Sequence, residues 1–109
     1  MSENLIDETV LTELQEDTGA EFLEELVTTF LEEAPGMIAE LKSAQEASDT
    51  DAFRRAAHSI KSNAHVFGAA GLADLAMKLE LEGESAVDVS ELENILSQTS
   101  DALRNYLNG

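Results

Sequence analysis

The chain has 109 residues, 43% of them hydrophobic, and a formal net charge of −17, because 23 acidic residues outnumber six basic ones. So acidic a surface repels nucleic acids and anionic membranes, and the absence of cysteine excludes disulfide and thiol chemistry. The first residues do not resemble a signal peptide, and no run approaches the roughly 20 apolar residues that span a bilayer. We therefore expect a cytoplasmic protein with a single domain over 1–109 that binds neither nucleic acid nor membrane.

Apolar residues recur at helical spacing from the start of the chain, and neither strand alternation nor hairpin turns are found. The spacing predicts a short first helix over 6–15 and a long second helix over about 20–46. Pro35 lies within the second pattern. Because proline lacks an N–H group and clashes with the preceding turn, we expect it to kink or restart this helix.

Three further helices are predicted in the second half of the chain. Capping side chains at 48–51 precede a helix over 51–66, and an apolar face marks another over 69–82 that ends near Gly83. The segment 83–89 is the clearest loop, and Ser90–Glu93 has the pattern of a capping box that opens the last helix. An antiparallel four-helix bundle would bury these stripes. We expect an all-α fold of this kind with a short extra N-terminal helix.

Both histidines of the chain lie in the segment AHSIKSNAHVFG, residues 57–68. At 100° per residue, His58 lies opposite the apolar face of its helix. That face consists of Phe53, Ala56, Ala57, Ile60, Ala64 and Phe67. The ring of His58 is therefore expected at the surface, where it is either idle or functional.

The residues around His58 bear on whether its ring is idle or functional. His65 is seven residues away, roughly 10 Å along the helix, which is too far for the two rings to share a zinc ion, so no metal site is expected. No acidic residue occurs from Ala52 to Ala73, whereas Arg54, Arg55 and Lys61 lie there. An anion approaching His58 is expected to meet these cations before the more distant acids. A basic patch that contacts a partner without chemistry fits the same pattern.

Imidazole near neutral pH is an available nucleophile. The chain lacks the glycine-rich loops that bind nucleotide phosphates, which argues against a kinase. A nucleophile among cations, without a donor site of its own, suits a phosphoryl group that a partner brings. Lys61, one turn from His58, can neutralise phosphoryl oxygens, and Ser62 can donate a hydrogen bond to them.

The stretch HSIKSNAHVFG, followed by AAGLADLAMKLE, resembles the signature of histidine-containing phosphotransfer (HPt) domains. The likeness rests on the spacing of His58, Lys61 and Gly68 and on the leucine face that follows, and it extends more weakly over nearly the whole chain. The resemblance implies a four-helix bundle in which His58 accepts a phosphoryl group, on Nε2, from a receiver-domain aspartate and returns it to another. It also implies that Gly68 keeps the surface below His58 low for the partner's loops.

The implied partners are response-regulator receiver domains, a hybrid histidine kinase, or both. Mg²⁺ would belong to the receiver, and no cofactor is expected on this chain. The expected contacts with the partner or the phosphoryl group are Arg54, Arg55, Ser62, His65 and Gly68.

Two residues depart from the family's pattern. Ser62 stands where glycine is frequent, and His65 where a small residue is usual. We expect His65 to be idle, with a partner contact or a hydrogen bond to the phosphoryl group as alternatives.

The chain is expected to be a monomer, because it has enough helices for its own bundle. The alternative function is an interaction module that binds receivers or other partners without carrying phosphoryl.

Overall fold

The computed structural model describes residues 5–83 and 88–108. They form five helices: α1 (Glu8–Thr18), α2 (Ala20–Glu46), α3 (Thr50–Val66), α4 (Ala70–Glu82) and α5 (Val89–Asn108). Within this described part there is no strand, so the predicted all-α class is confirmed. The first helix begins and ends later than predicted. The predicted loop over 83–89 falls largely on residues 84–87, which lie outside the described residues.

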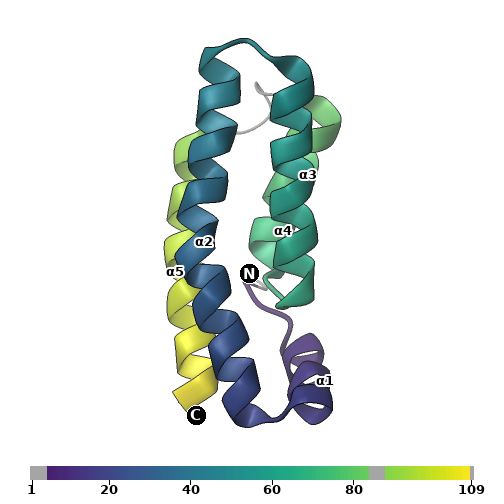
Figure 1. The fold of residues 1–109 in the computed structure, drawn as a ribbon, viewed down its shortest axis with the longest axis vertical. Helices are drawn as coiled ribbons and strands as arrows, with labels where there is room; N and C mark the ends of the chain where they lie inside the picture. The colour runs from purple at the N-terminus through teal and green to yellow at the C-terminus, as the bar shows by residue number, and fades with distance from the viewer. Residues whose placement is uncertain (1–4, 84–87, 109) are drawn as a thin grey trace.

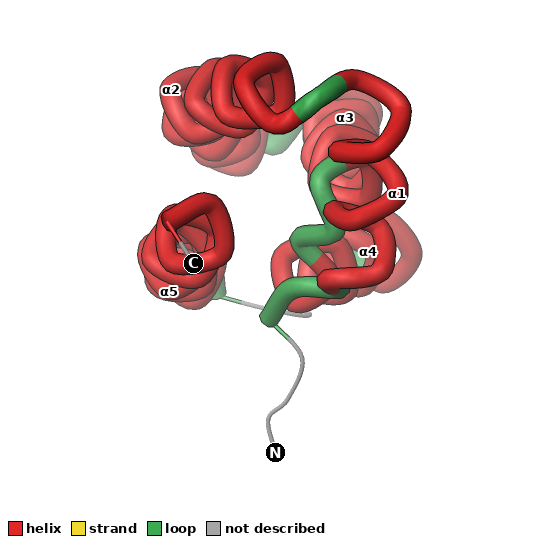
Figure 2. Tube along the Cα trace, turned by 90° about the horizontal axis from the view of Figure 1, so that it is seen from below, coloured by secondary structure: helices red, strands yellow, loops and turns green. Residues whose placement is uncertain are grey.

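Helices α2 to α5 lie side by side and run alternately in opposite directions along the long axis of the molecule (Figure 1). Helix α3 packs against α2 and α4, and α5 packs against the same two helices from the other side. Seen along this axis, the four helices surround a common centre (Figure 2). Helix α1 crosses the end at which α2 begins, and it packs against α2.

The apolar stripes of the four long helices meet at this centre, as their spacing requires. Helix α2 supplies the longest stripe. Pro35 lies on its exposed side, and α2 continues through the proline as one helix. The rings of Phe30 and Phe67 stack with their centroids 4.9 Å apart, which joins α2 to the end of α3. None of the described helices is both long and apolar enough to cross a membrane.

Aspartate side chains cap three of the helices. The Asp7 carboxylate accepts a hydrogen bond from the Thr9 N–H at the start of α1, and Asp49 accepts one from the Ala52 N–H at the start of α3. The predicted capping box at Ser90–Glu93 is wrong. Asp88 takes this role instead, because its carboxylate accepts the Ser90 N–H at 3.1 Å, and α5 therefore begins before Ser90.

The segment around the start of α1 is tied to the turn between α3 and α4. The Asp7 N–H donates to the Gly68 carbonyl at 2.6 Å, and the Gly71 N–H donates to the Leu5 carbonyl at 3.1 Å. A hydrogen bond of 3.0 Å between the hydroxyls of Thr12 and Tyr106 adds a contact to α5. The bond to Gly68 thus holds the residue that follows the end of α3, the helix that carries both histidines.

Candidate functional site

His58 lies on the outer side of α3, as its spacing predicts. The predicted apolar face points inward: Ala56 is half-buried, and the other members are buried, namely Phe53, Ala57, Ile60, Ala64 and Phe67. The His58 side chain is 58% exposed, so a second protein can reach its ring.

The ring of His58 is held from one side by Glu80 of α4. Nδ1 of His58 lies 2.8 Å from Oε2 of Glu80. The other carboxylate oxygen, Oε1, lies 2.8 Å from Nζ of Lys61. Because a carboxylate can only accept, the His58 Nδ1 carries the proton in this hydrogen bond. In the neutral ring the lone pair then belongs to Nε2, the nitrogen that Glu80 does not engage.

Glu80 is well suited to this double contact. Its side chain is only 17% exposed, although it carries a charge at neutral pH. The ion pair with Lys61 is the main cause that holds the pKa of Glu80 below its usual value; the hydrogen bond to His58 adds to it, and partial burial opposes both. The carboxylate therefore stays ionised and can bind both side chains.

This arrangement corrects the electrostatic argument made from the sequence. The gap in acidic residues from 52 to 73 does not keep acids away from His58, because α4 packs against α3 and brings Glu80 to the ring. Lys61 is likewise not free but paired with Glu80. A signal was present: position 80 follows the buried Leu79 and lies one turn after the buried Ala76, at the edge of the inward face of α4.

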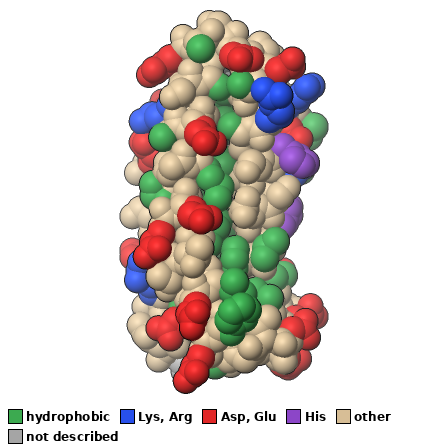
Figure 3. Space-filling view, in the orientation of Figure 1, with side chains coloured by type: hydrophobic (Ala, Val, Ile, Leu, Met, Phe, Trp, Pro, Cys, Tyr) green, Lys and Arg blue, Asp and Glu red, His purple; other side chains and the backbone are tan. Residues whose placement is uncertain are grey.

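The other predicted contact residues of α3 share its exposed side. Arg54, Arg55, Ser62 and His65 are all exposed. Arg54 pairs with Asp51 at 3.4 Å, but both side chains are exposed, so this pair holds the guanidinium only weakly. The two histidines lie one above the other along α3, with basic side chains above the upper one (Figure 3).

Gly68 does not lie where the resemblance implied. It is buried in the turn after α3, covered by the segment that precedes α1. Its φ of +67° belongs to the left-handed region, and a Cβ there would lie 2.7 Å from the Asp7 carbonyl oxygen. The glycine is therefore required by the backbone of the turn rather than by a partner's approach.

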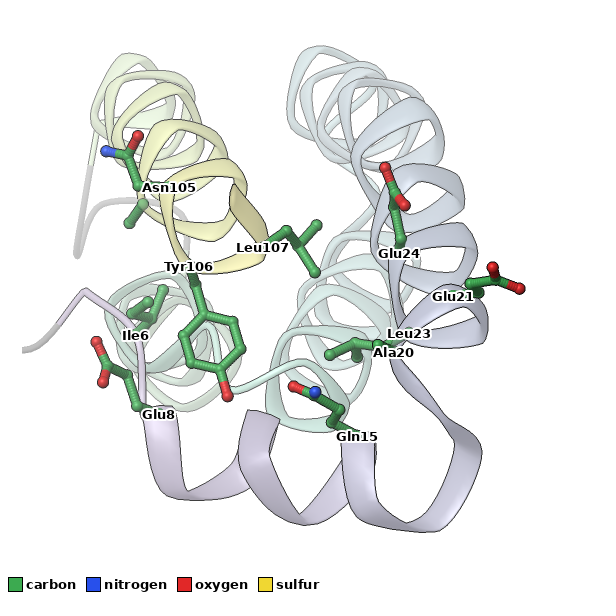
Figure 4. A pocket seen from close by; sticks show the side chains of 11 residues that line it. Ile6, Glu8, Gln15, Ala20, Glu21, Leu23, Glu24, Asn105, Tyr106 and Leu107 are labelled. Carbon is green, nitrogen blue, oxygen red and sulfur yellow. The ribbon is translucent and has the colours of Figure 1, made fainter. Parts of the chain in front are cut away.

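A groove of about 880 Å³ lies between α1, α2 and α5, at the end of the molecule where α5 terminates (Figure 4). Apolar side chains such as Leu23 and Leu107 form its floor, and Glu8, Glu21 and Glu24 contribute its charge. Among the described residues that line it there is no basic side chain and no histidine, so this groove would repel an anion. The groove at this end is thus a poorer candidate than the surface of α3.

Comparison with known proteins identifies a family for the chain. The family model of the Hpt domain matches residues 25–108, a segment that contains His58, Lys61 and Glu80. The solved structure of histidine-containing phosphotransfer protein B (HptB) from Pseudomonas aeruginosa PAO1 is similar in fold, with a TM-score of 0.86 at 24% sequence identity. The likeness covers 98% of this chain and 97% of that one. None of the curated proteins matches. The family resemblance is thus confirmed, and the chain belongs to the Hpt domain family.

Proposed function

We propose that this protein is a histidine phosphotransfer protein of a multistep phosphorelay, in which His58 carries a phosphoryl group between receiver-domain aspartates. The observation that carries the proposal is the exposed ring of His58 with its Nδ1 held by Glu80. This hydrogen bond leaves Nε2 as the nucleophile. Family membership supports the same reaction.

The transfer requires one bond to form and one to break. The lone pair of Nε2 attacks the phosphorus of the aspartyl phosphate, and the P–O bond to the aspartate breaks as its carboxylate leaves with the electron pair. The proton of Nδ1 stays in its hydrogen bond with Glu80, which stabilises the positive charge that develops on the ring. Because no proton has to move, the reverse reaction follows the same path, as a carrier needs.

Lys61 has two anionic partners in this scheme. It is paired with Glu80 in the unphosphorylated protein, within one turn of His58. Its flexible ammonium group can also approach the phosphoryl oxygens and offset their charge. We assign to it the neutralisation of the transferred group, whereas Mg²⁺ is expected on the receiver.

The same proposal covers the fold, the partners, the oligomeric state and the cellular compartment. We take α2 to α5 as the four-helix bundle, α1 as the extra helix and residues 1–109 as one domain. The partners are receiver domains or the receiver of a hybrid kinase. The working form is a monomer in the cytoplasm.

The test uses a receiver that carries labelled phosphate, with Mg²⁺ and without ATP. The protein should take up label that is labile to acid and stable to alkali, as a phosphohistidine is. His58→Gln should abolish the label, and His65→Gln, the matched change seven residues away, should retain it. Label kept by the first variant and lost by the second would contradict the choice of His58. Binding of receivers without any label would favour the interaction module.

A further inference from the structure

Three hollows lie end to end along the seam between α2 and α5. The groove of about 880 Å³ at the end of the molecule shares Glu24 and Leu107 with a small hollow of about 110 Å³. That hollow shares Leu31 and Arg104 with a third one of about 440 Å³, which reaches Ile38. We call the three together the α2–α5 furrow.

The α2–α5 furrow lies on the side of the bundle away from His58. Figure 2 shows α2 and α5 on one side of the common centre and α3 and α4 on the other. His58 touches Glu80 on the α3–α4 side. Among the described residues that line the furrow, none belongs to α3 or α4. A molecule bound in the furrow would therefore leave His58 open.

Half-buried leucines form the floor of the furrow. Leu31 comes from α2, and Leu96 and Leu107 come from α5, where they are about three turns, or roughly 16 Å, apart. Helix α2 packs less extensively against α5 than against α3, which leaves these leucines accessible. A third helix can lay its apolar side in the groove between two helices, with anchoring residues every three or four positions. A helix of about 14 residues would cover this length.

The charges along the furrow are mainly negative. Its described lining residues include five acids and one base, namely Glu8, Glu21, Glu24, Glu93, Asp101 and Arg104. Lys42, beside the furrow, pairs with Glu93 at 2.9 Å, so that four acids remain against Arg104. Nucleic acid would be repelled, and so would a second copy of this chain with its net charge of −17. Lysine or arginine side chains that flank an apolar stripe would be attracted.

From this combination of shape and charge we propose that the α2–α5 furrow binds a basic amphipathic helix of a partner protein. The apolar side of that helix packs on Leu31, Leu96 and Leu107, and its cationic flanks face the acids of the furrow. The site goes beyond phosphotransfer, because one partner can hold the protein here while His58 exchanges its phosphoryl group with another.

The test uses a fluorescent peptide of about 16 residues made of leucine, lysine and alanine, with leucines at i, i+4, i+7 and i+11 and lysines on both flanks. At about 0.15 M NaCl, fluorescence anisotropy should show saturable binding to the wild type. A scrambled peptide of the same composition should bind at least about tenfold more weakly.

Two charge variants locate the attraction. Glu24→Lys/Asp101→Lys, which reverses two charges of the furrow, should weaken binding about tenfold. Glu25→Lys/Glu32→Lys is the matched control, because it reverses two exposed charges of α2 outside the furrow, and it should weaken binding less than about threefold. Circular dichroism of both variants checks that they are folded.

A single introduced cysteine can report where the peptide binds, because the chain has none of its own. Ser97→Cys places a thiol in the furrow, and Ser62→Cys places one on the exposed side of α3. Bound peptide should slow alkylation of the first thiol and leave that of the second unchanged. His58→Gln should bind the peptide as the wild type does, so a failure of the proposed phosphotransfer is distinguishable from a failure of this site.

Three outcomes would overturn the proposal. Equal binding of the scrambled peptide, or equal losses in the two charge variants, would mean that the overall acidity of the protein alone attracts the peptide. Protection of Ser62→Cys in place of Ser97→Cys would put the peptide on the outer side of α3. Absence of binding to the wild type at peptide concentrations up to about 1 mM would exclude a basic amphipathic helix as the occupant.

Discussion

Among the single residues, Glu80 has the widest influence on the site. One carboxylate oxygen accepts the Nδ1 proton of His58, and the other pairs with Lys61. The first contact selects which ring nitrogen has the free lone pair, and the second keeps a cation within reach of it. The proposed nucleophile and the proposed neutralising charge are therefore oriented by the same side chain.

The low pKa of Glu80 predicts how stability depends on pH. Because its pKa is lower in the folded state than the value of about 4.3 in an unfolded chain, Glu80 stabilises the fold above that pH, and this contribution is lost as the pH falls through the folded value. We expect wild type to be more stable than Glu80→Gln at pH 6, and the difference to shrink as the pH falls below the range in which an unfolded glutamate titrates. Urea unfolding at several pH values measures it.

The control for this prediction is Glu82→Gln, which removes the same charge from an exposed position two residues away. Its difference from wild type should vary less between pH 6 and pH 3. An equal pH dependence in both variants would mean that the charge of α4 as a whole, and not the contacts of Glu80, sets the effect.

The contrast between His58 and Glu80 shows which residues of the site a sequence can reveal. The exposure of His58 follows from the period of one helix, because its apolar residues fix which side faces the core. The contact with Glu80 depends on how α3 and α4 are rotated against each other, and the two residues are 22 positions apart. The period of either helix alone does not give that rotation.

For the helices, the sequence predicts the interiors better than the ends. The long apolar stripes of α2 and α3 located both helices closely, whereas the start of α5 was misplaced because Asp88 caps it rather than Ser90. Several polar residues near a helix start have similar capping strength, so local sequence does not choose between them. The burial of Gly68 was missed because it depends on Asp7, which lies near the start of the chain and far from Gly68 in sequence.

Gly68 and Gly36 offer a matched pair of substitutions. Gly68→Ala would place a Cβ 2.7 Å from the Asp7 carbonyl in a left-handed residue, so we expect a loss of at least about 2 kcal/mol in the free energy of unfolding. Gly36→Ala, inside α2 with nothing within 4 Å of the added Cβ, should instead stabilise by up to about 1 kcal/mol. Denaturant unfolding of both variants measures the difference. Equal effects in the two would show that the turn tolerates a side chain.

Over the whole molecule, the net charge of −17 is carried by exposed acids, and few of them are paired with a cation in the described residues. One such pair, between Lys42 and Glu93, links α2 to α5 with a distance of 2.9 Å, but both side chains are about half exposed, so it stabilises little. Mutual repulsion of the unpaired acids therefore opposes the compact state.

This repulsion predicts that salt stabilises the protein. Raising NaCl from 0.01 to 0.1 M shortens the screening length from about 30 to about 10 Å, so the free energy of unfolding should rise on the order of 1 kcal/mol. Urea unfolding at each salt concentration measures it. The variant Glu32→Gln/Glu33→Gln, which lowers the charge of the exposed side of α2, should gain less from salt. A fall in stability with salt would show that ion pairs outweigh repulsion.

The ties of the α1 segment also bear on the order in which the protein assembles. Asp7 binds the backbone of the α3–α4 turn, Leu5 binds the first turn of α4, and Thr12 binds Tyr106, which lies 94 positions further along the chain. None of these partners is in place until the later helices have collapsed together, and closing such long loops costs entropy. We therefore expect the first helix of the chain to be among the last to pack against the others, and to be the first to detach when the molecule unfolds.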